Sequence, residues 1–263
     1  MRHEVVQSRR IVVKVGSSSI SGDNAGNIHL IVDALAAAHR AGTQVVLVTS
    51  GAIATALPIL GLTARPDDLP GQQAAAAVGQ NMLMNRYQDS LNRFDIVAAQ
   101  VLLTAGDLDH PANRQNAHMA LDRLLDMRMF PIVNENDTVA TAEIRFGDND
   151  RLAALVAELV GADLLVLLSD VDALYTKPPH EPGAQRIDYV TAGDDLSGVE
   201  IGSIGSAGVG TGGASTKIAA AKYASSEGIP VILTATVNIA EVLRGDEVGT
   251  WFEPVERQAP AVD

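Results

Sequence analysis

Short apolar runs alternate along the chain with longer stretches whose apolar residues recur at helical spacing. The runs are rich in β-branched residues, and most are followed by small or polar residues, which is typical of buried strands. They predict strands over residues 11–15, 45–48, 96–103, 130–133, 164–168, 231–233 and 248–252. The longer stretches predict helices over residues 27–40, 69–91, 113–127, 150–159, 214–227 and 239–243.

Strands that alternate with helices indicate an α/β protein with a mostly parallel central sheet covered on both faces. We expect the strand over residues 248–252 to lie at the sheet edge and residues 139–146 to form a small hairpin. Residues 176–183 contain three prolines and predict a loop, and residues 254–263 predict a frayed tail. The pattern shows no internal repeat.

Composition narrows the class of protein. At 263 residues and 47% hydrophobic residues, the chain can bury a sizeable core, which excludes a disordered protein. The net charge of −13 and the 3% aromatic content argue against nucleic acid as a partner. Glu158 and Asp163 interrupt the most apolar region, so we expect no membrane span. No secretory signal is visible, and we expect a cytoplasmic protein. The chain has no cysteine, which excludes disulfides and thiolate catalysis.

Small and polar residues follow four of the predicted strands. Because ligands bind at the carboxyl ends of strands in an open parallel sheet, these residues are candidates for one common site. The four segments are residues 14–19, 49–52, 134–137 and 169–170. Each segment by itself could also be an ordinary turn or helix cap.

Lys14 stands within an otherwise apolar strand. A lysine is almost never fully buried without a partner, so Lys14 either reaches solvent from an edge strand or is directed at a phosphate. The turn that follows, at Gly16 and Ser17, offers backbone N–H groups that suit an anion.

A glycine-rich segment over residues 208–217 leads into a predicted helix, whose N-terminus also suits a phosphate. Gly208, Gly210 and Gly213 match G-x-G-x-x-G, but the segment does not follow a strand directly and no acidic residue stands about 20 positions on. A dinucleotide fold is therefore rejected, and no Walker A pattern exists. A flexible surface loop is the alternative. Lys217 in the first turn opposes the helix dipole, which an anion site would tolerate.

Two clusters of acidic and amide residues, 134–137 and 147–150, lie about a dozen positions apart. Asp148 or Asn149 could simply cap the next helix. The clusters could instead bind an ammonium group, orient lysines or hold a metal. The six histidines are scattered, so a histidine-bound metal is not expected. Two lysines, two phosphate-binding turns and an aspartate cluster together favour phosphoryl transfer.

Five segments resemble the glutamate 5-kinases, a branch of the amino acid kinase family. They are residues 12–18, 48–54, 133–144, 146–150 and 210–217. The resemblance extends over about residues 9–253. It implies a three-layer α-β-α sandwich in which one kinase domain, residues 1–253, binds glutamate through its N-terminal part and ATP through the part from about residue 160.

The resemblance also implies an activity. Members phosphorylate the γ-carboxylate of L-glutamate with ATP and Mg²⁺ to give γ-glutamyl phosphate, the first step of proline biosynthesis, and proline is the usual feedback inhibitor. Members assemble as dimers or tetramers. Many carry a C-terminal PUA domain, for which we expect this chain to be too short. No particular protein ligand of Mg²⁺ is implied.

Site residues follow from the matching positions. Lys14 and Lys217 would stabilise the transferring phosphoryl group, and Asp150 would hold both lysines. The residues implied to bind glutamate are Ser50, Gly51, Asn134, Asp137 and Asn149. Those implied to bind ATP are Lys14, Gly16, Ser169, Asp170, Thr211, Gly212, Gly213, Ala214, Ser215, Thr216 and Lys217. Ser17 and Ala214 depart from the family's usual Thr and Met.

Three other interpretations stay open. The chain could be an amino acid kinase with another acceptor, a non-catalytic amino acid sensor, or a general nucleotide-binding module. Lys14, Asp150 and Lys217 argue against the sensor, since a sensor needs none of them.

Overall fold

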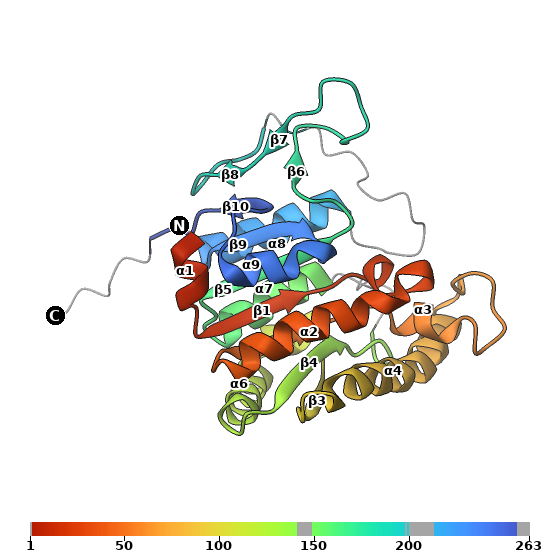
Figure 1. Cartoon of the computed structure of the whole chain (residues 1–263). Coiled ribbons are helices and arrows are strands. Elements are labelled where there is room, and N and C mark those ends of the chain that lie inside the picture. Colours follow the sequence, from red (N-terminus) through yellow and green to blue (C-terminus); the bar gives the residue numbers. More distant parts are fainter. Residues whose placement is uncertain (1, 141–148, 198, 200–212, 257–263) are drawn as a thin grey trace.

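The computed structural model describes residues 2–140, 149–197, 199 and 213–256. Within them, eight strands form one sheet in the order β3-β4-β2-β1-β5-β9-β10-β8 (Figure 1). The strands are β1 (Arg10–Lys14), β2 (Gln44–Val48), β3 (Ala98–Leu103), β4 (Phe130–Glu135), β5 (Leu164–Ser169), β8 (Tyr189–Val190), β9 (Val231–Ala235) and β10 (Thr250–Phe252). Every neighbouring pair except β9 and β10 is parallel, which confirms the predicted mostly parallel sheet.

The prediction that the last strand lies at the sheet edge is wrong. β10 pairs with β9 on one side and with the two-residue strand β8 on the other, so β8 is the edge. Trp251 and Phe252 are almost fully buried, and a strand with such side chains is stabilised by cover on both sides. β8 is too short to leave a periodic pattern in the sequence, as are β6 (Leu174–Tyr175) and β7 (Arg186–Ile187), which form a separate antiparallel pair.

The predicted helices are present, with bounds shifted by no more than two residues. They are α2 (Asn27–Arg40), α4 (Leu69–Asn92), α6 (Pro111–Asp126), α7 (Asn149–Leu159), α8 (Ala214–Ser226) and α9 (Ile239–Arg244). The sequence pattern did not predict three short helices: α1 (Arg2–Gln7), α3 (Ala52–Ala56) and α5 (Ala105–Asp109). Each has at most six residues, so an apolar stripe cannot develop along it.

Apolar side chains cover both faces of the sheet. One face packs against α1, α2, α4 and α9, and the other packs against α5, α6, α7 and α8. Side chains alternate between the two cores along each strand, as Val12 and Val13 of β1 illustrate. The result is a three-layer α-β-α sandwich, as expected.

Some expectations fall where the structure gives no description. The predicted hairpin lies mostly outside the described residues, as do residues 208–212 of the glycine-rich segment and most of the predicted tail. Residues 176–183 connect β6 to β7 without helix or strand, which confirms the predicted loop. Among the described helices, none has both the length and the apolar character needed to cross a membrane.

Candidate active site

Asn149, the first residue of α7, joins the carboxyl ends of two strands. Its Nδ2 lies 2.9 Å from the Thr49 carbonyl oxygen, 2.8 Å from Ser50 Oγ and 3.0 Å from Asn134 Oδ1. Thr49 and Ser50 follow β2, and Asn134 lies near the end of β4. The amide therefore links segments that the sequence predicted to meet at one sheet edge. Its Oδ1 accepts no hydrogen bond among the described residues, so the side chain does not cap α7 there.

Gly51 brings the turn after β2 against the turn after β1. Its φ of +98° lies in the left-handed region, and an added Cβ would lie 3.6 Å from the Ser17 Cα and 3.5 Å from Ile20. Gly51 is also the residue that precedes α3. A glycine here thus permits both the sharp chain reversal and the close approach of the two turns.

Lys14, Asp150 and Lys217 form one compact charged cluster. Lys14 Nζ lies 2.6 Å from Asp150 Oδ1, and Lys217 Nζ lies 3.2 Å from Asp150 Oδ2. The three side chains are 3%, 1% and 11% exposed, so the cluster is held away from water. Thr216 Oγ1 donates a further hydrogen bond of 2.7 Å to Asp150 Oδ2. The prediction that Asp150 contacts both lysines is therefore confirmed.

The sheet order decides between the two interpretations of Lys14. β1 is hydrogen-bonded to β2 on one side and to β5 on the other, so Lys14 does not reach solvent from an edge strand. Its ammonium group lies over the following turn, where a Cβ on Gly16 would be 3.6 Å from Nζ. The cation therefore stands at the carboxyl end of an interior strand, beside the predicted anion-binding turn.

The electrostatics of the cluster depend on Asp150. Burial raises the pKa of this carboxyl, but attraction to Lys14 and Lys217, together with hydrogen bonds from Lys14 and Thr216, outweighs it. The net effect lowers the pKa to about 2, so Asp150 is ionised at neutral pH. One carboxylate beside two ammonium groups leaves the cluster with a net positive charge.

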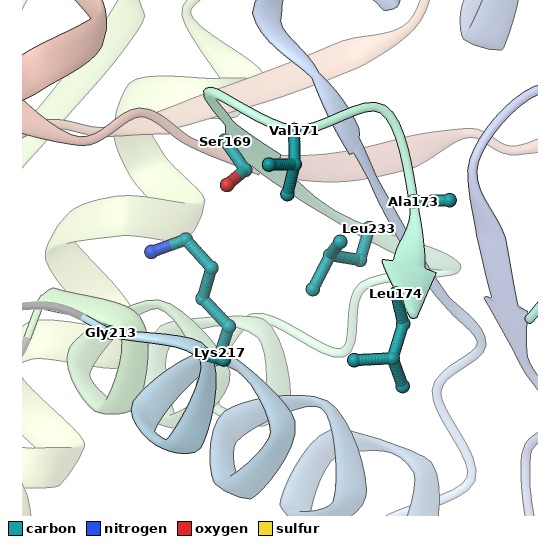
Figure 2. Close-up of a pocket in the computed structure, with 8 residues that line it drawn as sticks. Ser169, Val171, Ala173, Leu174, Gly213, Lys217 and Leu233 are labelled. Carbon is teal, nitrogen blue, oxygen red and sulfur yellow. The ribbon is translucent and has the colours of Figure 1, made fainter. Parts of the chain in front are cut away.

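Lys217 also reaches a pocket between β5 and the start of α8. Figure 2 shows its side chain extending from the helix toward Ser169. The remaining lining residues are mostly apolar: Val171, Ala173, Leu174, Gly213, Ala214 and Leu233. Four residues predicted to bind ATP therefore line one pocket: Ser169, Gly213, Ala214 and Lys217. The sequence analysis did not predict the apolar part of the lining, because apolar residues in these positions are also typical of an ordinary core.

Asp170 and Ser215, which are also predicted to bind ATP, are not among the residues that line this pocket. Ser169 Oγ donates to Asp170 Oδ1 at 3.1 Å, and Asp170 is exposed. Ser215 is exposed in the first turn of α8. Thr211 and Gly212 lie outside the described residues.

Asp137 lines a different cavity, of about 300 Å³, between α4, β3 and the segment after β4. Burial raises the pKa of Asp137 to about 6, although attraction to Arg65 opposes the shift. Gln80 lines the same cavity and accepts a 2.7 Å hydrogen bond from Asn134 Nδ2. Asp137 is thus connected to the other predicted glutamate residues through Gln80, which the sequence analysis missed. Its place on the apolar side of the predicted helix, four residues after Ala76 and three before Leu83, was the available signal.

The described residues do not fit a metal ion held by the protein. No group of three or more His, Asp or Glu side chains among them could ligate one. Asp150, the carboxylate of the charged cluster, already contacts two lysines and Thr216. The cluster can instead stabilise a polyanion directly through its ammonium groups.

Comparison with known proteins shows the family of this chain and its fold. The amino acid kinase family model matches residues 9–235, and the chain belongs to this family. The fold resembles carbamate kinase from Giardia lamblia bound to AMP-PNP, with a TM-score of 0.67 at 15% identity, covering 95% of this chain and 100% of that one.

Relatives within the family share much higher identity. The glutamate 5-kinase of Leifsonia xyli is 67% identical, over 98% of this chain and 96% of that protein. The glutamate 5-kinase of Clavibacter sepedonicus is 66% identical, over 96% of this chain and 97% of that protein. The glutamate 5-kinase of Streptomyces coelicolor is 55% identical, and the match covers 98% of this chain and 70% of that protein.

Proposed function

We propose that this chain is a kinase that transfers the γ-phosphoryl group of ATP to the γ-carboxylate of L-glutamate, the first step of proline biosynthesis. The observation that carries the proposal is the buried cluster in which Asp150 holds the ammonium groups of Lys14 and Lys217 at the carboxyl edge of the sheet. Phosphoryl transfer requires little covalent help from a protein, and fixed positive charge is its main need.

The chemistry needs no general base. The γ-carboxylate of glutamate, with a pKa of about 4.3, is already ionised at neutral pH. One carboxylate oxygen attacks the γ-phosphorus, the bond from that phosphorus to the β–γ bridging oxygen breaks, and ADP leaves with the electron pair. Lys14 and Lys217 offset the repulsion between the two anions and stabilise the charge that spreads over the phosphoryl oxygens.

The two substrates approach this cluster from different sides. ATP takes the pocket beside Lys217, with its base against Val171, Leu174 and Leu233. The residues proposed to contact ATP are Lys14, Gly16, Ser169, Asp170, Thr211, Gly212, Gly213, Ala214, Ser215, Thr216 and Lys217. Glutamate is bound by the earlier part of the domain, and the residues proposed to contact it are Ser50, Gly51, Asn134, Asp137 and Asn149.

Charge explains how an amino acid is selected. Asp137, when ionised, pairs with the α-ammonium group of glutamate, which a plain dicarboxylic acid lacks. Mg²⁺ would accompany ATP, bound by phosphate oxygens and water rather than by a protein cage, and would offset phosphate charge. Proline acts as a feedback inhibitor, the chain assembles as a dimer or tetramer, and the enzyme works in the cytoplasm.

An acceptor panel tests the proposal. ATP turnover with Mg²⁺ is measured with glutamate, aspartate, N-acetylglutamate, carbamate and uridylate, and acyl phosphate is trapped with hydroxylamine. Glutamate is expected to give a hydroxamate that requires ATP and that proline suppresses. Turnover with another acceptor would overturn the proposed substrate. Folded protein that binds glutamate or ATP without any turnover would point to a sensor.

A further inference from the structure

Four amide side chains form a hydrogen-bonded row from the cavity to the charged site. Gln80 Nε2 donates to Gln100 Oε1 at 2.9 Å, and Asn134 Nδ2 donates to Gln80 Oε1 at 2.7 Å. Asn149 Nδ2 then donates to Asn134 Oδ1 at 3.0 Å. β3, α4, β4 and α7 each contribute one member, so the row spans the glutamate side of the molecule.

Backbone groups at two points fix the direction of the row. The Glu135 N–H donates to Asn134 Oδ1 at 2.9 Å, and the Thr49 carbonyl accepts from Asn149 Nδ2 at 2.9 Å. A backbone N–H can only donate and a carbonyl can only accept, so neither amide can be turned over. Asn134 therefore presents Nδ2 to α4, where an acceptor is required.

Gln80 supplies that acceptor from a buried position on α4. Asn134 is only 1% exposed, so water does not readily replace Gln80 as its partner. A buried donor that loses its partner is costly, and the amide would turn or shift to find another. Any such movement of Asn134 would also disturb Asn149, which donates to it.

A movement of Asn149 would displace its Oδ1, which is available to accept a hydrogen bond. Among the described residues, Asn149 Oδ1 is buried and accepts no hydrogen bond. Its orientation follows from Nδ2, which is engaged by Thr49, Ser50 and Asn134. A buried amide oxygen in this state suits a ligand that donates N–H groups, such as an ammonium ion.

We propose that Gln80 is a positioning residue for amino acid recognition: through Asn134 it holds Asn149 so that Oδ1 accepts from the α-ammonium group of the substrate. The inference rests on the proposed function, because it takes glutamate as the acceptor. Gln80 acts on specificity and binding rather than on the phosphoryl group, which the lysine cluster serves.

The test compares glutamate with glutarate, which has both carboxylates but no α-ammonium group. Gln80→Met keeps the side-chain length and removes its hydrogen bonds. It is expected to raise the KM for glutamate about tenfold or more, with kcat within about threefold of wild type. The kcat/KM for glutarate is expected to change by less than about threefold, so the preference for glutamate over glutarate falls.

Two matched variants complete the design. Gln80→Glu retains an acceptor for Asn134 Nδ2 and is expected to keep the wild-type preference within about threefold. Gln100→Met removes only the outer link of the row and is expected to do the same. Gln80→Leu replaces Gln80→Met if the latter does not fold.

Equal loss of activity toward glutamate and glutarate in the Gln80→Met enzyme would overturn the positioning role, and so would an unchanged preference. A loss of preference in Gln80→Glu as large as in Gln80→Met would overturn it too. If the wild-type protein phosphorylates neither acid, the proposed function itself fails. This outcome is seen in the wild-type measurement and is therefore distinct from a failure of the role of Gln80.

Discussion

At the scale of single residues, the charged site is organised around Asp150, which lies between two lysines. Its carboxylate contacts the two buried ammonium groups of Lys14 and Lys217 and accepts a hydrogen bond from the half-buried Thr216 hydroxyl. Buried ion pairs add little net stability, but removing one partner leaves an uncompensated charge. The three charged residues are therefore interdependent.

Asp150→Asn is expected to destabilise the fold by about 3–5 kcal/mol, because two buried ammonium groups then face each other without a counter-charge. Since the folded pKa of about 2 lies below the ordinary 3.8, the charge of Asp150 stabilises the protein above pH 4 and loses this effect as the pH falls toward 2. Urea unfolding of both proteins across this range should show their difference shrink by about 2 kcal/mol. A difference independent of pH would contradict the assignment.

Lys217→Ala is expected to lower kcat about 100-fold or more, with a much smaller change in the KM for glutamate, because the ammonium group acts on the transition state. Lys14→Ala is expected to behave in the same way. Lys222→Ala is the matched control, since Lys222 lies on the same helix and its Nζ donates only to the exposed Asp195 carbonyl among the contacts described. Steady-state kinetics separate the outcomes, and a pure KM effect would refute the role.

Asp137 predicts a pH dependence of glutamate binding. Its pKa of about 6 means that the carboxyl becomes neutral as the pH falls through 6 and can no longer pair with an ammonium group. The KM for glutamate should rise about tenfold at pH 5, while the γ-carboxylate, with a pKa of about 4.3, stays ionised. In Asp137→Asn the KM should be high throughout and nearly flat. The same pH profile in wild type and variant would exclude Asp137 as the titrating group.

At the scale of elements, the packing of α3 against α4, beside the proposed glutamate site, depends on a single glycine. A Cβ on Gly79 of α4 would lie 1.7 Å from the carbonyl oxygen of Ala52, the first residue of α3. The two helices therefore touch backbone to backbone. α3 follows Ser50 and Gly51 directly, so its position also sets the turn after β2.

Gly79→Ala is expected to destabilise the fold by about 1–3 kcal/mol and to raise the KM for glutamate, because α3 must move away. Gly26→Ala is the matched control, since a Cβ there meets nothing within 4 Å and its φ of −69° suits any residue. Thermal unfolding and kinetics of both variants check the prediction. Equal stability of the two would show that α3 can shift without cost.

The element scale also shows where prediction from sequence stops. Apolar periodicity located helices such as α2 and α4 to within a residue, because each carries several turns of buried side chains. It missed α3 and the two-residue strand β8, because neither is long enough for a periodic pattern of apolar residues to repeat. The misassigned edge strand β10 follows from the missed β8.

At the scale of the whole molecule, the two sides proposed to bind glutamate and ATP share one continuous sheet. β1 pairs with β2 toward the glutamate side and with β5 toward the ATP side, and both apolar cores extend across it. Opening either side would expose strands and core of the other. The sheet therefore favours unfolding as one cooperative unit.

Trp251 offers a direct test, because it is the only tryptophan, is 2% exposed and lies in β10 near the far edge of the sheet. Its fluorescence and the far-ultraviolet circular dichroism of the whole chain are expected to give the same midpoint in urea. Two separate midpoints would show that the ATP side unfolds independently of the rest.

The sequence by itself determined the fold class, the strand ends that meet, and the residue types of the charged site. The periodicity of apolar residues and the resemblance of short segments suffice for these features, because both are recorded in stretches of consecutive residues. Resemblance also implied that Asp150 holds both lysines. Only the tertiary structure decided that Lys14 lies on an interior strand, at what distances Asp150 contacts the two lysines and Thr216, and that Gln80 supports Asn134. These contacts join residues about 50 to 140 positions apart, and no local pattern records which distant side chains share a buried space.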